Sequence, residues 1–128
     1  MNGSVLIVDD DAGCGRLLAL LVRQLGHDAD YVESGGKALD YLSGRRPDLV
    51  ILDVMMPGID GLEVLRRVRH NPRTADVPVV IFSALADPNL LQDIRRQGAN
   101  ECWVKASMNF QDLQKRLEVY LSRDQAPN

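Results

Sequence analysis

The chain has few aromatic residues and few cysteines, and it contains no long apolar run. Aromatic side chains make up 5% of its 128 residues, and its two cysteines, Cys14 and Cys102, have neither disulfide-framework nor zinc-ligand spacing, so we expect reduced thiols. No apolar stretch approaches the roughly 20 residues of a membrane-spanning helix. The polar N-terminus also lacks the features of a signal peptide. We therefore expect a cytoplasmic protein that does not bind membranes.

The chain also lacks an excess of positive charge. Its 15 lysines and arginines are outnumbered by 18 aspartates and glutamates, which gives a formal net charge of −3. The arginine pairs at 45–46, 66–67 and 95–96 are scattered among separate segments. Proteins bind the nucleic-acid backbone mainly by neutralising phosphates with clustered basic side chains. We therefore expect no direct binding of nucleic acid.

Short apolar runs recur along the chain, whose hydrophobic content of 45% is enough for one buried core. The predicted strands are Val5–Val8, Ala29–Val32, Leu49–Leu52, Val77–Phe82 and Cys102–Val104. Four of these runs are nearly continuous in apolar character, as expected when both faces of a parallel sheet are covered. The second run is more polar, which is typical of an edge strand.

Between the runs, apolar residues recur at the three- and four-residue spacing of helices. The predicted stripes are Leu17, Leu18, Leu21, Val22 and Leu25; Ala38, Leu39 and Leu42; Leu62, Leu65 and Val68; Leu90, Leu91 and Ile94; and Phe110, Leu113, Leu117, Tyr120 and Leu121. Five strand–helix repeats predict an α/β fold, a doubly wound five-stranded parallel sheet with helices on both faces. We expect one domain over residues 1–122 and a polar C-terminal tail over residues 123–128.

Polar side chains follow four of the predicted strands. The first strand is followed by Asp9 and Asp10, the third by Asp53, the fourth by Ser83 and the fifth by Lys105. Ligands of doubly wound sheets bind outside the carboxyl ends of the strands, near the point where the strand order reverses. We therefore expect these carboxylates, the hydroxyl and the ammonium to gather at one edge of the sheet.

This set of side chains has a chemical logic. Packed carboxylates repel one another unless a cation neutralises them, and Mg²⁺ prefers oxygen ligands such as one or two carboxylates. With the metal bound, one carboxylate can attack a phosphoryl group and become an aspartyl phosphate. Ser83 and Lys105 are suitable donors to the phosphoryl oxygens, where negative charge develops.

The order and spacing of these motifs resemble those of the receiver domain of bacterial response regulators. The residues that carry the resemblance are Asp9-Asp10 after the run 5–8, the stretch 52–61 (LDVMMPGIDG), Ser83-Ala84 after a strand, and Lys105 after Trp103-Val104. The similarity covers about residues 4–122. It implies a flavodoxin-like fold with the strand order 2-1-3-4-5.

The resemblance also implies roles and partners. Asp53 would be the phosphoacceptor; Asp10, Asp53 and the backbone carbonyl of Met55 would hold Mg²⁺; Asp9 would act through a water; and Ser83 and Lys105 would bind the phosphoryl oxygens. A sensor histidine kinase or a histidine phosphotransfer protein would supply the phosphoryl group. A downstream effector protein or domain, or a second copy in a homodimer, would respond to it. The domain would catalyse only its own phosphorylation and dephosphorylation.

Three features depart from the pattern of that family. Ala106 stands where proline is usual after the lysine, so we expect a trans peptide bond there and a rearranged loop over residues 106–109. Cys102 occupies the usual place of a switch aromatic, and Trp103 should point to the opposite face of the sheet. Met55 and Leu85 are apolar where polar side chains can orient an attacking water. We therefore expect slow self-dephosphorylation.

Other functions on the same fold fit the sequence less well. A pseudo-receiver, acting as an unphosphorylated interaction module, would accommodate the departures at Cys102 and Ala106, but the intact acids and Lys105 oppose it. A flavin carrier needs a Ser/Thr/Gly-rich phosphate loop where this chain has three aspartates, and haloacid-type phosphatases need a second aspartate where Met55 stands. The sequence therefore favours a receiver that is switched by phosphorylation.

Overall fold

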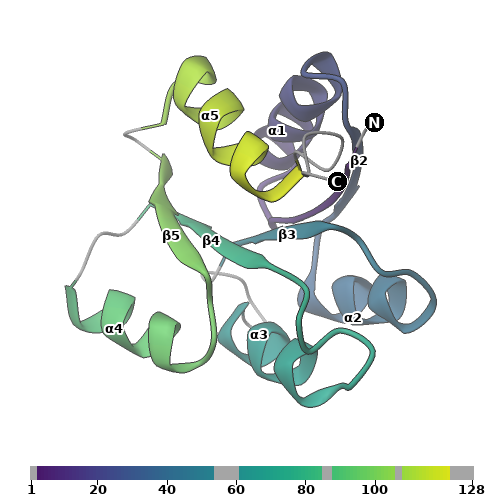
Figure 1. Cartoon of the computed structure of the whole chain (residues 1–128), viewed down its shortest axis with the longest axis vertical. Coiled ribbons are helices and arrows are strands. Elements are labelled where there is room, and N and C mark those ends of the chain that lie inside the picture. Colours follow the sequence, from purple (N-terminus) through teal and green to yellow (C-terminus); the bar gives the residue numbers. More distant parts are fainter. Residues whose placement is uncertain (1–2, 54–60, 85–87, 106–107, 122–128) are drawn as a thin grey trace, which may run out of the picture.

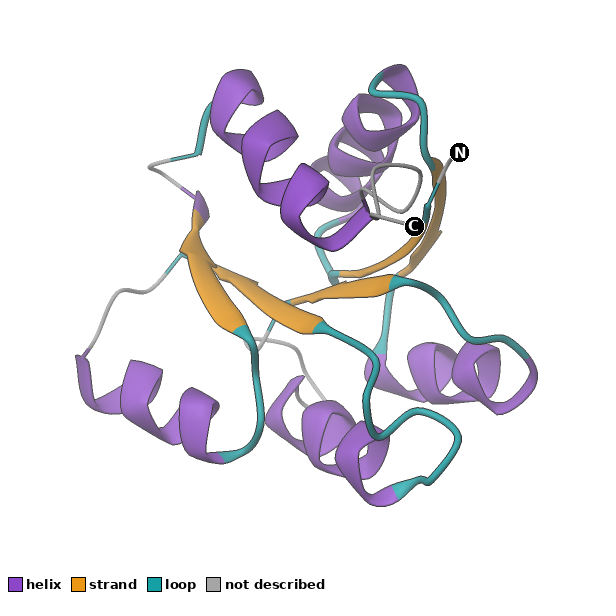
Figure 2. Cartoon of the chain, viewed as in Figure 1, coloured by secondary structure: helices purple, strands orange, loops and turns teal. Residues whose placement is uncertain are grey.

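Strands and helices alternate along the computed structural model, which describes residues 3–53, 61–84, 88–105 and 108–121 (Figure 1, Figure 2). The elements are β1 (Ser4–Val8), α1 (Ala12–Gln24), β2 (Asp28–Val32), α2 (Gly35–Gly44), β3 (Leu49–Leu52), α3 (Gly61–His70), β4 (Val79–Ser83), α4 (Pro88–Arg96), β5 (Glu101–Val104) and α5 (Phe110–Leu121). Each predicted strand is present, with ends that agree to within two residues. In the part of the chain that the structure describes, no helix is long and apolar enough to cross a membrane.

The five strands form one parallel sheet in the order β2-β1-β3-β4-β5. Helices α1 and α5 cover one face, and α2, α3 and α4 cover the other, as Figure 1 shows. The doubly wound fold and the strand order expected from the sequence are thereby confirmed. The order reverses between β1 and β3, which lie side by side, so the carboxyl ends of these two strands flank the expected ligand site.

The fourth strand begins two residues later than predicted and ends one residue later. Val77 is fully buried, but it closes a turn, with its amide donating to the Thr74 carbonyl at 3.0 Å. Pro78 has no N–H to donate, although its carbonyl accepts from the Val50 amide at 3.0 Å. The regular strand therefore starts at Val79 and includes Ser83.

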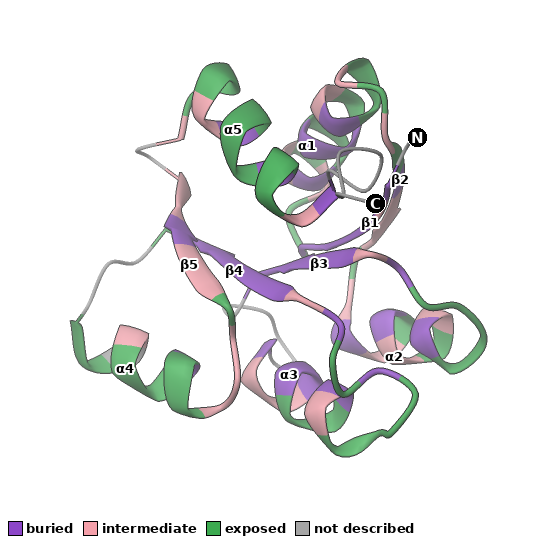
Figure 3. Cartoon of the chain, viewed as in Figure 1, coloured by how far each residue is buried: buried purple, intermediate pink, exposed green. Residues whose placement is uncertain are grey.

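Two hydrophobic cores lie on opposite faces of the sheet, because successive strand residues point to opposite sides. In β1, Leu6 and Val8 belong to the core beneath α2, α3 and α4, whereas Val5 and Ile7 belong to the core beneath α1 and α5. Strands β3 and β4 are buried throughout and β1 is buried from its second residue on, while the helices keep exposed outer faces (Figure 3). The edge strand β2 is only partly buried, as its polar sequence predicted.

Two of the predicted stripe residues are exposed to solvent. Leu17 in α1 is 57% exposed, and Phe110, the first residue of α5, is 42% exposed. Their spacing places them at the margins of stripes whose centres are buried, among them Leu18 and Val22 in α1 and Leu113 and Leu117 in α5. Helical spacing marks the direction of the apolar face but not its width, so membership of a stripe does not by itself predict burial.

Local signals set both ends of α1, the helix that follows the first acids. Asp11 caps its N-terminus, with its side chain accepting from the Cys14 amide at 3.2 Å. At the other end Gly26 has a φ of 95°, and the Gly26 and His27 amides return to the carbonyls of Arg23 and Val22. This Schellman ending stops α1 just before Gly26.

Candidate functional site

The carboxyl ends of neighbouring strands bring the predicted acids together. The Asp53 amide, just beyond β3, donates to the Val8 carbonyl of β1 at 2.9 Å, so Asp53 directly adjoins the end of β1. Asp9 and Asp10 follow Val8 there. One carboxylate oxygen from each of Asp9, Asp10 and Asp53 lies within 4.8 Å of the other two. We call these three residues the acid pocket.

The acid pocket suits a hard divalent cation. Asp9 is 3% exposed and Asp53 is 7% exposed, whereas Asp10 is open to solvent. Three close carboxylates need compensating positive charge, and oxygen donors are the ligands that Mg²⁺ prefers. The donor set on this edge of the sheet therefore fits Mg²⁺, with the exposed Asp10 on the solvent side.

Lys105 follows β5 and reaches across the sheet to the acid pocket. Its Nζ lies 2.8 Å from Asp9 Oδ2 and 3.5 Å from Asp53 Oδ2, and 5.7 Å from the centroid of the Phe82 ring. Burial alone would lower the pKa of the Lys105 ammonium, but the hydrogen bond to Asp9 and the charges of Asp53 and Asp9 outweigh it. The net effect raises this pKa, so Lys105 is positively charged beside the acids.

Asp9 is held through both its side chain and its main chain. Its Oδ1 accepts from the Asp11 amide at 2.9 Å, while Oδ2 binds Lys105. Its amide donates to the Val32 carbonyl at 3.2 Å, and its carbonyl accepts from the Tyr31 hydroxyl at 2.6 Å. Sequence reasoning missed Tyr31, because no motif links a residue of the second strand to the turn after the first.

Cys14 in the first turn of α1 is also next to the acid pocket, and its side chain is hydrogen-bonded to Asp9. Burial raises the pKa of the Cys14 thiol; Lys105 opposes this rise, and Asp9 adds to it. The thiolate is the nucleophilic form of cysteine, so a raised pKa disfavours reactivity. Both Cys14 and Cys102 are free thiols, as the sequence predicted.

Ser83 ends β4, between the strand that precedes Asp53 and the strand that precedes Lys105. Ser83 is fully buried, and it pairs in register with Val104 of β5. The structure thus places Asp9, Asp10, Asp53, Ser83 and Lys105 at the carboxyl edge of one sheet. The remaining predicted ligand, Met55, lies outside the described residues, as do Leu85 and Ala106.

The two departures on β5 point to opposite faces, as predicted. Cys102 packs against the core beneath α2, α3 and α4, whereas Trp103 is 2% exposed in the core beneath α1 and α5. The Trp103 Nε1 donates to Glu101 Oε1 at 3.3 Å, and the Arg116 guanidinium lies 5.9 Å from the centre of the Trp103 ring. Trp103 is therefore a packed residue of the hydrophobic core.

An apolar groove of about 220 Å³ opens between α1 and α5 and extends to Lys105. The exposed side chains of Leu17 and Phe110 line it, together with Cys14 and Phe82. The exposed surfaces of Leu17 and Phe110 therefore lie together in one groove beside the acid pocket.

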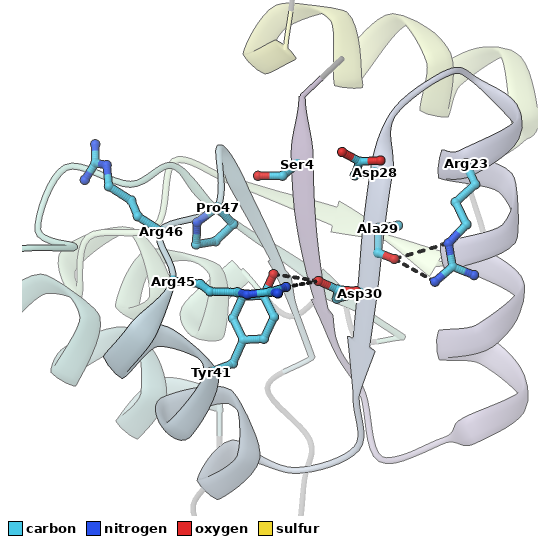
Figure 4. Close-up of a pocket in the computed structure, with 9 residues that line it drawn as sticks. All are labelled: Ser4, Arg23, Asp28, Ala29, Asp30, Tyr41, Arg45, Arg46 and Pro47. Carbon is cyan, nitrogen blue, oxygen red and sulfur yellow. Dashed lines mark hydrogen bonds and ion pairs between the residues drawn. The ribbon is translucent and has the colours of Figure 1, made fainter.

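A larger cavity of about 590 Å³ lies by the edge strand, toward the amino ends of β1 and β2 (Figure 4). Asp30 Oδ2 accepts from the Tyr41 hydroxyl at 2.7 Å and from Arg45 Nη1 at 3.3 Å. On the other side of β2, Arg23 donates twice to the Ala29 carbonyl, at 2.7 and 3.2 Å. Arg23, Asp30 and Arg45 thus bind neighbouring residues, and the cavity is at the opposite end of the strands from the acid pocket.

Fold and site together define a class: doubly wound α/β proteins with an acidic, cation-compatible pocket at the carboxyl edge of the sheet. The chain matches the response regulator receiver domain over residues 5–118 and belongs to that family. It is therefore a receiver domain of two-component response regulators, which is a signalling domain.

Relatives of known sequence agree with this assignment. Sporulation initiation phosphotransferase F of Bacillus subtilis is 31% identical over 121 residues, which are 94% of this chain and 95% of that protein. Transcriptional regulatory protein AfsQ1 of Streptomyces coelicolor is 42% identical over 84 residues, 66% of this chain but 36% of that protein. The phosphate regulon regulator PhoB of Pseudomonas aeruginosa is 30% identical over 94% of this chain and 52% of that protein. The chain thus spans about a third to a half of the length of several of its relatives.

Solved structures agree with the fold. Chemotaxis protein CheY4 of Vibrio cholerae has a TM-score of 0.88 and 26% identity, covering 94% of this chain and all of that one. The signal receiver domain of a DNA-binding response regulator from Colwellia psychrerythraea has a TM-score of 0.84 and 28% identity, covering 92% of this chain and 97% of that one.

Proposed function

We propose that this receiver domain is a phospho-switch in which Asp53 accepts a phosphoryl group from the phosphohistidine of a sensor histidine kinase or a histidine phosphotransfer protein. The observation that carries the proposal is the close set of Asp9, Asp10 and Asp53 carboxylates with the Lys105 ammonium among them. One carboxylate, one cation site and one fixed positive charge are the parts that phosphoryl transfer to an aspartate requires.

The transfer step moves one phosphoryl group between two nucleophiles. An Asp53 carboxylate oxygen forms a bond to phosphorus as the bond from phosphorus to the donor's imidazole nitrogen breaks. The bonding electrons go to that nitrogen. The imidazole leaves neutral, because its other nitrogen already carries a proton or the freed nitrogen takes one from solvent, and Asp53 becomes a mixed anhydride. In this proposal Asp10, Asp53 and the Met55 carbonyl hold Mg²⁺, and Asp9 acts through a water. When bound, Mg²⁺ would neutralise charge on the phosphoryl oxygens.

Lys105 and Ser83 supply the remaining donors in this proposal. Lys105 already carries a full positive charge within 3.5 Å of Asp53 Oδ2, so little reorganisation is needed to bind a phosphoryl oxygen there. Ser83 ends the neighbouring strand β4 on the same edge. Their alignment with the acceptor is the protein's own contribution to the rate.

Phosphorylation then changes the charge of one edge of the sheet. It adds about −1.5 to −2 charges at Asp53, which biases the segments around α4 and β5. In the proposal a downstream effector protein or domain, or a second copy of the chain, reads this change. The proposal keeps the cytoplasmic location expected from the sequence and includes no direct contact of residues 1–122 with nucleic acid or membrane.

The test uses a small acyl-phosphate donor with Mg²⁺ and reads the intact mass of the protein. The wild type should gain one phosphoryl group, and Asp53→Asn should gain none. Removing Mg²⁺ with a chelator should abolish the gain. A wild-type protein that stays unmodified with this donor and shows no Asp53-dependent NMR shifts with beryllofluoride would overturn the proposal.

We further propose that the phosphorylated state is long-lived. Apolar Met55 cannot orient an attacking water, so Met55→Asn should raise the rate of aspartyl-phosphate hydrolysis, by about tenfold if water orientation limits the step. The decay of the phosphorylated mass, with Mg²⁺ present and the donor removed, measures this rate. An unchanged hydrolysis rate in Met55→Asn would contradict this part of the proposal.

A further inference from the structure

Tyr31 joins the edge strand β2 to the main chain of the acid pocket. Its hydroxyl donates to the Asp9 carbonyl at 2.6 Å, and the next residue, Val32, accepts from the Asp9 amide at 3.2 Å. The edge strand therefore holds both main-chain polar groups of Asp9. One of these contacts is made by a side chain, so a point substitution can remove it without breaking the sheet.

Gly15 of α1 provides the space that this contact needs. A Cβ built on Gly15 would lie 2.2 Å from Tyr31 Cε1 and 2.6 Å from Tyr31 Cδ1. Both distances are too short for carbon atoms that are not bonded to each other. Gly15 is buried at the fourth position of α1 after the Asp11 cap, where a helix would favour alanine by about 1 kcal/mol. Glycine at this position therefore leaves room for the Tyr31 ring but lowers the stability of α1.

The bond from Tyr31 acts on the peptide unit that leads to Asp10. The Asp9 carbonyl and the Asp10 amide belong to one rigid plane, so fixing the carbonyl also fixes the direction in which the chain enters Asp10. The Asp10 side chain is exposed, unlike Asp9, whose carboxylate is held by Lys105 and by the Asp11 amide. Asp10 therefore depends on its main chain for its direction toward the acid pocket.

We infer that Tyr31 is a positioning residue for the cation site. Gly15 leaves the space that the Tyr31 ring occupies, and we call this space the notch. This inference rests on the proposed metal site. Tyr31 does not contact the acid-pocket carboxylates directly; it acts through the Asp9–Asp10 peptide. Losing its hydroxyl should weaken Mg²⁺ binding without removing any ligand.

The first test is Tyr31→Phe, which deletes the hydroxyl and keeps the ring. Partners that orient metal ligands change metal affinity by about 10- to 100-fold when removed, and a contact one peptide away should lie at the lower end. Mg²⁺ titration by calorimetry should show about tenfold weaker binding. With an acyl-phosphate donor, the Mg²⁺ concentration for half-maximal phosphorylation should rise in proportion, while the rate at saturating Mg²⁺ stays close to that of the wild type.

Tyr41→Phe is the matched control. Tyr41 also donates one hydroxyl hydrogen bond to a residue of β2, Asp30, at 2.7 Å, but it does so at the cavity far from the acid pocket (Figure 4). Both variants lose one short bond, so both should lose some thermal stability. Only Tyr31→Phe should lose Mg²⁺ affinity.

Gly15→Ala tests the notch. It should displace the Tyr31 ring and weaken Mg²⁺ binding as Tyr31→Phe does, and the double variant Gly15→Ala/Tyr31→Phe should bind Mg²⁺ no more weakly than the weaker single variant. Such non-additivity is expected when two residues act through one contact.

The inference is overturned if Tyr31→Phe and wild type bind Mg²⁺ equally, or if Tyr41→Phe weakens binding as much as Tyr31→Phe does. Because the titration needs no phosphoryl donor, it decides the role of Tyr31 even if the wild type accepts no phosphoryl group, a result that would overturn the proposed function alone. A wild type that binds no Mg²⁺ would overturn both.

Discussion

Lys105 has two opposing effects at the acid pocket. Its ammonium lies within 3.5 Å of both Asp9 and Asp53, so it neutralises charge that a cation would otherwise neutralise. The same positive charge is well placed to bind a phosphoryl oxygen once Asp53 reacts. Binding of Mg²⁺ and transfer of the phosphoryl group should therefore respond to Lys105 in opposite directions.

We predict that Lys105→Met binds Mg²⁺ several-fold more tightly, and at most about tenfold more tightly. We also predict that this variant is phosphorylated about 100-fold more slowly. Calorimetry measures the first quantity and intact mass against time measures the second. Lys115→Met, which removes an exposed lysine of α5, is the control and should change neither. Weaker Mg²⁺ binding in Lys105→Met would contradict the prediction.

Tyr120 links the last turns of α5 to β5, with its hydroxyl hydrogen-bonded to Glu101. Burial, followed by the hydrogen bond and the charge of Glu101, raises the pKa of Tyr120 well above its usual range. A tyrosine whose pKa is higher in the folded than in the unfolded protein stabilises the fold fully below the unfolded pKa of about 10. That stabilisation is lost as the pH rises above 10 toward the folded pKa.

We therefore predict that the free energy of unfolding falls above pH 10, and that it falls less steeply in Tyr120→Phe. At pH 7 the variant should be less stable than the wild type by about 1–2 kcal/mol, because the Glu101 carboxylate loses one of its donors. Urea denaturation at a series of pH values measures both effects. Equal slopes above pH 10 in the two proteins would show that Tyr120 is not the group responsible.

The residues that motifs mark were predictable, and those that act through tertiary contact were not. Asp11, which caps α1, is of the readable kind, because capping depends on local sequence alone. The Tyr31 contact with Asp9 spans 22 residues and requires a glycine in another element. Neither Tyr31 nor Gly15 belongs to a local motif, so a single sequence does not show that the two residues are in contact.

At the scale of elements, Arg69 ties the end of α3 to the two segments that lead into β4 and β5. Its Nη1 donates to the Val77 carbonyl at 2.7 Å, its Nε donates to the Gly98 carbonyl at 2.9 Å, and its Nη2 donates to Asn100 Oδ1 at 3.0 Å. Asn100 Oδ1 in turn accepts from the Val79 amide at 2.9 Å. One planar guanidinium therefore sets where two strands begin.

We predict that Arg69→Met destabilises the fold by about 3 kcal/mol, because several partly buried oxygen acceptors lose a charged donor at once. Arg69→Lys should recover only part of this loss, since a single ammonium cannot reproduce the planar fork. Arg67→Met is the control on the same helix: it removes an exposed ion pair with Glu63, worth about 0.5 kcal/mol. Equal losses for positions 67 and 69, measured by urea denaturation, would contradict the assigned role.

The strands and helices themselves were readable from hydrophobic spacing, and their ends were less so. The start of β4 was predicted two residues early because Val77 is as apolar as a strand residue, while its hydrogen bonds belong to a turn and to Arg69. Leu17 and Phe110 belong to predicted apolar stripes, yet they are exposed because an open groove between α1 and α5 adjoins them. Both features are set by neighbours distant in sequence.

At the scale of the whole molecule, the sheet order places the acids in one pocket, and this was the most predictable property of all. Alternating strands and helices with right-handed crossovers leave few topologies. The carboxyl edge then follows from chain direction, so the positions of Asp9, Asp53 and Lys105 at one edge could be inferred without knowing any distance. The roles assigned to these side chains remain predictions that the transfer and titration experiments address.

We predict that Mg²⁺ stabilises the whole fold, since the cation would bind the folded acid pocket and have little affinity for the unfolded chain. At a Mg²⁺ concentration about 100 times the dissociation constant, the gain should be about 2.7 kcal/mol, visible as a higher melting temperature. Asp10→Asn should reduce the gain, and Ca²⁺, which prefers more ligands, should give a different one. A melting temperature that is independent of Mg²⁺ in the wild type would contradict the prediction.

The burial of Trp103 also determines how this molecule can be observed. It is the sole tryptophan of the chain, and its indole is enclosed beneath α1 and α5 with the Arg116 guanidinium 5.9 Å from its ring. Fluorescence excited at the indole band therefore originates from a single place, two residues before the lysine of the acid pocket. Any rearrangement that lifts α5 from β5 should alter the colour or quenching of that emission, so the unlabelled protein carries its own optical sensor.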